Sequence, residues 1–157
     1  MIEEIRAFFS PQMIYLWLNF GVLPFWFVLI FFPQSRICNY LVTSIFPIFL
    51  LSVIYLYLFY YHFMNNYNYL GNFNLYLGLD NLKSLFLNET FLLMFWIHFL
   101  GVNLFCGCYI VKDSQKFSLS KYLIFSPLVI TYFIGPLGIL IYWIIRIISA
   151  KRFNIID

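Results

Sequence analysis

Two polar side chains interrupt the apolar run WIHFLGVNLFCGCYI, which extends from Trp96 to Ile110. Histidine is the side chain that most often serves as a general acid or base near neutral pH, so His98 is the first candidate for chemistry. Asn103 can donate and accept hydrogen bonds but cannot take up a proton. At about 100° per helical residue the two side chains point about 140° apart. They therefore either flank one substrate or make separate contacts.

The composition indicates that lipid surrounds much of the chain that positions these residues. Of 157 residues, 64% are hydrophobic and 10% are charged, whereas a soluble domain has about 45–50% and about 25%. A chain this short cannot bury the excess in one core. The net charge of +3 is too small for a nucleic-acid surface. We expect one membrane domain over residues 1–157, in contact with membrane lipid and without a nucleic-acid partner; the oligomeric state stays open.

Four apolar stretches without Asp, Glu, Lys or Arg are long enough to cross a bilayer: residues 12–32, 40–63, 91–111 and 122–145. About 20 helical residues span a hydrocarbon core about 30 Å thick. Short loops join the first pair and the second pair, which predicts two helical hairpins. The expected fold is therefore an all-α, integral membrane four-helix bundle.

The long connection over residues 64–90 carries Leu79, Leu82, Leu85 and Phe86 at helical spacing. This pattern predicts a short interfacial helix between the second and third spans, with a plain surface loop as the alternative. Four spans place both termini on one side with five Lys or Arg residues, against four on the other. That difference does not decide the orientation by the positive-inside rule.

The N-terminus, MIEEIRAFFSPQ, lacks the basic region and the cleavage site of a signal peptide. We therefore expect an integral protein of a bacterial inner membrane or a plastid-type membrane, without a cleaved signal or transit peptide.

Polar residues of three spans fall at similar depths. Counted from the side of the N-terminus at about 1.5 Å per residue, Asn19 and His98 lie about 10 Å deep, Asn103 about 18 Å, and Thr131 with Tyr132 about 20 Å. An amide or imidazole that faces lipid leaves its donors unsatisfied, so such residues turn inward. We predict a site between the first, third and fourth spans. For Asn19 and Thr131 the alternative is hydrogen bonding between helices.

The fourth span also carries a groove of small residues. Gly135 and Gly138 share one helical face with Thr131, so another helix or a flat ligand could lie close to them. Pro136 removes a helical hydrogen bond and frees the carbonyl group of Tyr132. The predicted binding residues combine this groove with aromatic walls and polar contacts: Asn19, Trp26, Trp96, Asn103, Thr131, Tyr132, Gly135 and Gly138.

Four segments together resemble the abscisic-acid-deficient-4-like family: NFGVLPFW at 19–26, FWIHFLGVNLFCG at 95–107, YIVKD at 109–113 and SPLVITYFIGPLGILIY at 126–142. The resemblance covers essentially the whole chain in the same order. It implies a small integral membrane protein similar to those needed to convert violaxanthin to neoxanthin. That isomerisation opens an epoxide and forms an allene.

His98 matches the histidine of the family, and the resemblance implies that it is the catalytic acid or base of a carotenoid or isoprenoid isomerase. The family pattern reads HYLAFD where this chain has HFLGVN from His98 to Asn103. An amide thus replaces a carboxylate, and Phe99 lacks the tyrosine hydroxyl. The substitution favours the alternative of a non-enzymatic pigment-binding, lipid-binding or accessory protein, so enzymatic activity stays open.

Two further alternatives are weaker. A haem-b bundle would use His62 and His98 as axial ligands, but His62 lies about 9 Å shallower in its span. A transporter would need a coupling-ion site, and no charged residue marks one within the spans. The cysteines, Cys38, Cys106 and Cys108, are expected to be ordinary apolar residues. We therefore expect no metal and no cofactor.

Overall fold

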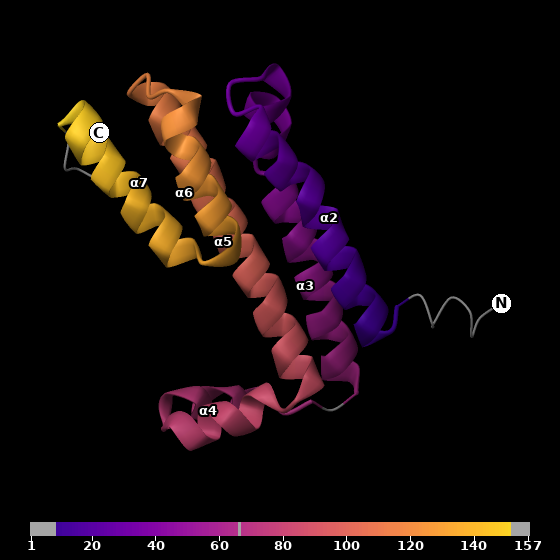
Figure 1. The fold of residues 1–157 in the computed structure, drawn as a ribbon. Helices are drawn as coiled ribbons and strands as arrows, with labels where there is room; N and C mark the ends of the chain where they lie inside the picture. Colours follow the sequence, from indigo (N-terminus) through magenta and orange to yellow (C-terminus); the bar gives the residue numbers. More distant parts are fainter. Residues whose placement is uncertain (1–8, 66, 152–157) are drawn as a thin grey trace. The chain divides into compact units, whose positions relative to one another are not determined.

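The computed structural model describes residues 9–65 and 67–151. Their regular structure is helical, in the following order (Figure 1): α2 Pro11–Phe31, a π-helix Cys38–Val42, α3 Phe46–Met64, a 3-10 helix Tyr69–Tyr76, α4 Leu79–Phe86, α5 Glu89–Lys116, α6 Lys121–Phe133 and α7 Gly135–Ala150. The all-α prediction is confirmed. Most of the N-terminal sequence used in the signal-peptide argument lies outside the described residues, as do Arg6 and Arg152 of the charge count.

Three helical segments are long and apolar enough to cross a membrane: Pro11–Phe31, Cys38–Met64 and Glu89–Lys116. They correspond to the first three expected spans and make the chain compatible with an integral membrane protein. The second of them begins as the π-helix and bends at 43–45 before α3. The predicted amphipathic helix of the middle connection is present as α4.

The prediction of one continuous helix over 122–145 is wrong, because the chain breaks at Ile134 between α6 and α7. Pro136 lacks the N–H that would continue the helical hydrogen bonds to Tyr132. In a continuous helix Thr131 and Gly138 would lie about 10 Å apart along the axis. A Cβ added to Gly138 would instead lie 2.5 Å from the backbone nitrogen of Thr131. The chain therefore reverses, and α6 and α7 form a hairpin (Figure 1).

Neither arm of this hairpin is long enough to cross a bilayer alone. α6 has 13 residues and α7 has 16, whereas about 20 are needed. The expected bundle of four membrane-crossing helices is therefore replaced, in the described residues, by three long apolar helices and a hairpin of two short ones.

The chain divides into two compact units, and each is described by itself. The first unit contains residues 9–21 and 49–100, and the second contains residues 22–48 and 101–151 among those described. α2, α3 and α5 each pass from one unit into the other. The single domain expected over residues 1–157 stays a prediction.

In the first unit, α4 runs across the direction of α3 and of the first part of α5 (Figure 1). Phe86 of α4 holds this arrangement by ring contacts with Phe91 at 5.5 Å and Phe95 at 4.8 Å. The hydroxyl group of Thr90 lies 3.3 Å from Nδ1 of His62 and joins the start of α5 to the end of α3.

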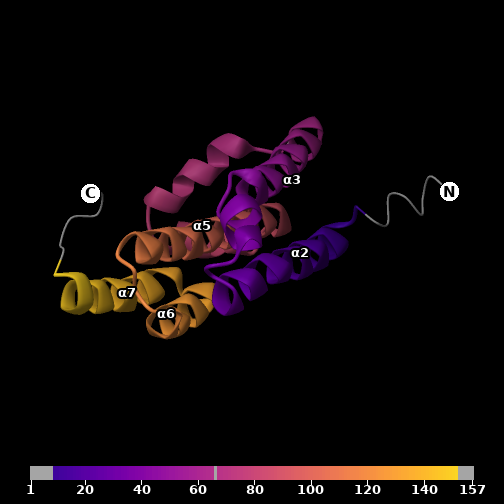
Figure 2. The same cartoon turned by 90° about the horizontal axis from the view of Figure 1, so that it is seen from above.

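In the second unit, α7 runs parallel to the last part of α5, and α6 runs antiparallel to both. Asn103 of α5 lies against Gly135 at the start of α7, and Asp113, ten residues later, lies against Tyr142 and Arg146. The two views agree that α6 and α7 lie beside this part of α5 (Figures 1 and 2). The contacts therefore fix the direction of each arm.

Candidate functional site

Asn103 belongs to α5, and its side chain lies against the tip of the α6–α7 hairpin in the second unit. Its side chain is 3% exposed, and Nδ2 donates a long hydrogen bond of 3.5 Å to the carbonyl oxygen of Tyr132. This is the carbonyl that Pro136 leaves without a helical donor. Backbone breaks in apolar surroundings are tolerated where other groups satisfy the freed atoms. Asn103 therefore caps the C-terminal end of α6 from a neighbouring helix.

The small-residue groove of the hairpin is filled by the protein itself. The backbone of Thr131 occupies the space over Gly138, and the side chain of Asn103 occupies the space over Gly135. The Thr131 hydroxyl group is buried and donates to the carbonyl oxygen of Pro127 at 2.7 Å, within its own helix. No room for a flat ligand is left at either glycine.

Trp26 completes this packing from α2. Its buried indole would lie 2.8 Å from a Cβ added to Gly107, and its ring lies 5.4 Å from that of Tyr132 in an edge-on contact. We call the packed cluster the hairpin joint; six predicted binding residues form it: Trp26, Asn103, Thr131, Tyr132, Gly135 and Gly138.

A buried ion pair anchors α7 to α5 nearer the end of α5. Nε of Arg146 lies 3.1 Å from Oδ2 of Asp113, and the two side chains are 2% and 9% exposed. The hydroxyl group of Tyr142 donates to the same carboxylate oxygen. The guanidinium group of Arg146 lies 4.6 Å from the ring centroid of Phe117. Sequence reasoning placed Asp113 and Arg146 on the flanks of spans and missed their pairing.

A signal for this pair was present in the sequence. Asp113 is the only acidic residue in 90–151, and Arg146 is the only basic residue in 122–150. Tyr142 and Arg146 share one helical face at a spacing of four. Pairing Arg146 with Asp113, however, requires the reversal at Ile134, which the expected continuous span did not contain.

Asn19 and Trp96 come together in the first unit. Nε1 of Trp96 donates to Oδ1 of Asn19 at 3.3 Å, and Nδ2 of Asn19 donates to the carbonyl oxygen of Tyr15 at 2.7 Å. The rings of Tyr15 and Trp96 lie 5.8 Å apart. This cluster joins α2 to α5, which is the helix–helix role considered for Asn19. Tyr15 was not among the predicted site residues.

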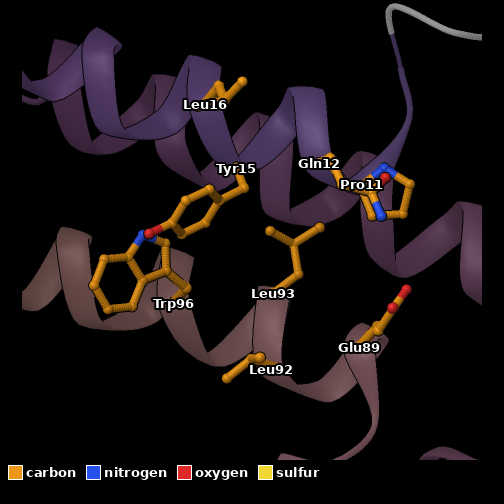
Figure 3. A pocket seen from close by; sticks show the side chains of 8 residues that line it. All are labelled: Pro11, Gln12, Tyr15, Leu16, Glu89, Leu92, Leu93 and Trp96. Atoms are coloured by element: carbon orange, nitrogen blue, oxygen red, sulfur yellow. The ribbon is translucent and has the colours of Figure 1, made fainter.

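Beside this cluster lies a groove of about 600 Å³, which we call the α2–α5 groove (Figure 3). Tyr15 and Trp96 lie at one end, and Gln12 and Glu89 lie at the other. The full lining is Pro11, Gln12, Tyr15, Leu16, Glu89, Leu92, Leu93 and Trp96. A groove this apolar, with few polar groups at its ends, suits an elongated hydrophobic ligand.

A second groove of about 600 Å³, the α2–α3 groove, lies on the other side of α2 in the same unit. It is lined by Phe9, Ile14, Trp17, Leu18, Val53, Ile54 and Tyr57. None of the predicted site residues lines it. It offers apolar surface without the carboxylate and amide groups of the α2–α5 groove.

His98 is exposed on α5 and does not line either groove. It points about 200° around the helix from Trp96 at about 100° per residue. The neighbouring side chains on its own face, Phe95, Val102 and Phe105, are apolar and also exposed. The imidazole is therefore accessible to lipid or to a ligand that lies against this face of α5.

His62 lies at the end of α3, and the part of α5 that it contacts is far from His98. Its contact with Thr90 sets it eight residues, or about 12 Å, before His98 on that helix. Axial ligation of one haem iron needs both histidines at the metal, which this separation does not fit. In the part of the chain that the structure describes, no three His, Cys, Asp or Glu side chains gather where they could hold a metal ion.

The fold alone does not identify the family of the chain, whereas comparison with protein families does. A family profile described as ABA DEFICIENT 4-like matches residues 13–142 of the 157. The chain belongs to the ABA4-like family. The match includes His98, the hairpin joint and the lining of the α2–α5 groove except Pro11 and Gln12 in this ABA4-like protein. No curated protein and no solved structure is significantly similar to the chain.

Proposed function

We propose that this ABA4-like protein is an integral membrane protein that binds an isoprenoid lipid of the carotenoid class in the α2–α5 groove. The groove itself carries the proposal: leucine side chains line it between an aromatic end at Tyr15 and Trp96 and a polar end at Gln12 and Glu89. Aromatic rings offer a polyene flat apolar contact. Family membership supports the neoxanthin-synthase-like type of protein, and with it the isoprenoid class.

Filling the groove tests the proposal. Leu16, 44% exposed, lines the α2–α5 groove, whereas Leu23, 42% exposed, lies two turns later on α2 and lines neither groove. Leu16→Trp should lower the pigment bound per protein severalfold because the indole occupies the ligand volume. Leu23→Trp should leave it unchanged. The readout is the visible spectrum of protein purified in mild detergent from a carotenoid-producing host, with mass spectrometry of the extract.

Equal loss of bound pigment in both variants would show that the α2–α5 groove is not the binding site. A colourless parent protein would show that the ligand is not a carotenoid. Trp17→Leu and Trp96→Leu make the same change in the α2–α3 and α2–α5 grooves. Loss in Trp17→Leu alone would move the site to the α2–α3 groove.

Isomerisation of an isoprenoid is the second candidate function, with His98 as acid or base. Because His98 does not line the α2–α5 groove, this function requires the isoprenoid to lie on the His98 face of α5. Its support is the exposed imidazole on an apolar face of α5, together with the family to which the chain belongs. The bound pigment should then differ chemically from that of the host. His98→Ala should abolish the conversion and leave the unconverted pigment bound, whereas His62→Ala should convert normally. A pigment identical to the host's in the parent protein would leave binding without catalysis.

A further inference from the structure

Five exposed basic residues lie at one end of the second unit. They are Arg36 after α2, Lys112 and Lys116 at the end of α5, Lys121 at the start of α6, and Lys151 after α7. The connection that carries Arg36 is held at this end by two hydrogen bonds to α5. Lys112 donates to Oδ1 of Asn39 at 3.2 Å, and Gln115 donates to the carbonyl oxygen of Pro33 at 2.7 Å.

The hairpin brings the end of α7 to the same place. Because α7 runs parallel to α5, Arg146 reaches Asp113, and Lys151 lies about 8 Å further along the chain. Figure 1 shows the end of α7 and the α5–α6 connection at the same end of this unit. A continuous fourth span would have carried Lys151 to the opposite side of the membrane.

Among the residues that the structure describes, acidic side chains do not offset the positive charge at this end. Asp113 is the only acid among the described residues of the second unit, and its carboxylate is buried against Arg146. Among the described residues of the first unit, Lys83 is the only Lys or Arg, and it pairs with Asp80 at 3.0 Å. Among the described residues, five exposed basic side chains therefore lie in the second unit and one in the first.

We propose that this basic end lies on the non-translocated side of the membrane and binds the anionic phospholipid headgroups of that leaflet. Lys and Arg accumulate on the non-translocated side, and they attract anionic lipids close to the surface. The α6–α7 hairpin then enters the membrane from this side, reaches the level of Asn103, and returns. The inference rests on the proposed membrane crossing of α2, α3 and α5, but not on isoprenoid binding.

Cysteine accessibility tests the sidedness. Ser84 lies on α4, Ser118 in the α5–α6 connection and Ser149 near the end of α7, and all three are exposed. In intact bacterial cells an impermeant maleimide should label Ser84→Cys alone. Ser118→Cys and Ser149→Cys should react only after permeabilisation. The parent chain, treated alike, gives the background of its native cysteines. Labelling of Ser149→Cys together with Ser84→Cys would restore the four-span arrangement and overturn the proposal.

Lipid selectivity tests the partner. The detergent-purified protein should retain severalfold more phosphatidylglycerol than phosphatidylcholine by native mass spectrometry. Replacing both Lys121 and Lys151 by Gln should remove most of that preference, whereas Lys83→Gln, in the first unit, should keep it. Equal retention of the two lipids by the parent would overturn the anionic-lipid contact. Both readouts are independent of pigment, so their failure is distinguishable from failure of isoprenoid binding.

Discussion

The side chain of Asn103 shows how an amide in an apolar helix can serve the backbone rather than a substrate. It donates to the carbonyl oxygen of Tyr132 and lies against Gly135, at the point where the chain reverses. The HYLAFD pattern that this segment resembles has a carboxylate at this position. A carboxylate only accepts hydrogen bonds, whereas an amide also donates. In this chain the amide suits the carbonyl that Pro136 exposes.

Asn103→Asp should therefore destabilise the protein. A charged oxygen would replace the donor next to a buried carbonyl, at a cost of about 1–3 kcal/mol or more. Asn39→Asp is the matched control, because Oδ1 of Asn39 accepts from Lys112 and a carboxylate keeps that role. Thermal unfolding in detergent should show a lower Tm for Asn103→Asp only. Unchanged stability together with new isomerase activity would instead mark position 103 as catalytic.

The ion pair between Asp113 and Arg146 makes a second prediction at this scale. Removing either partner leaves a buried charge unpaired, which costs about 3–5 kcal/mol. Arg146→Met and Asp113→Leu should each lower the free energy of unfolding by that order. The double variant should lose clearly less than the sum, because neither charge remains. Additive losses in this double-mutant cycle would show that the two side chains do not depend on one another.

At the scale of the elements, the α6–α7 hairpin depends on the absence of a side chain at Gly138. The backbone of Thr131 lies where a Cβ would be, so the two helices approach more closely than any other residue allows. The break at Ile134 supplies the reversal, and Asn103 satisfies the carbonyl group that the break exposes. The close approach at Gly138, the break at Ile134 and the hydrogen bond from Asn103 therefore act together to form the hairpin.

Gly138→Ala should force α6 and α7 apart and destabilise the protein, because the clash is with backbone and cannot be relieved by a rotamer change. The expected loss is about 1–3 kcal/mol, as for other overpacked sites. Gly21→Ala is the control: a Cβ there meets nothing within 4 Å, and alanine favours the helix by about 0.5–1 kcal/mol. A Gly138→Ala variant as stable as the parent would contradict the close packing of the hairpin.

At the scale of the whole molecule, three apolar helices and one hairpin distribute charge differently from four spans. The four-span prediction placed five basic residues on one side and four on the other. The reversal at Ile134 transfers Arg146 and Lys151 to the side of Lys112, Lys116 and Lys121. One turn of backbone therefore gives the positive-inside rule a basis for the proposed orientation, which the four-span charge count left open.

The sequence by itself predicted the long apolar helices and the family of the protein. Apolar runs of about 20 residues require helices in lipid, because every backbone group must be satisfied within the segment. This local rule predicted α2, α3 and α5, and the helical spacing of the apolar residues in the middle connection predicted α4. The four matching segments predicted the family that the profile comparison then showed. The prediction that Pro136 frees the carbonyl group of Tyr132 also followed from one residue alone.

Only the tertiary structure decided how that freed carbonyl is satisfied and where the chain goes next. A proline in a span permits either a kink or a reversal, and the choice depends on contacts between residues distant in sequence, such as Asn103 with Tyr132 and Asp113 with Arg146. Residues at one depth were therefore predicted as a ligand site, whereas most of them pack around the reversal. The α2–α5 groove likewise arises from two helices, and no local pattern specifies the space between them.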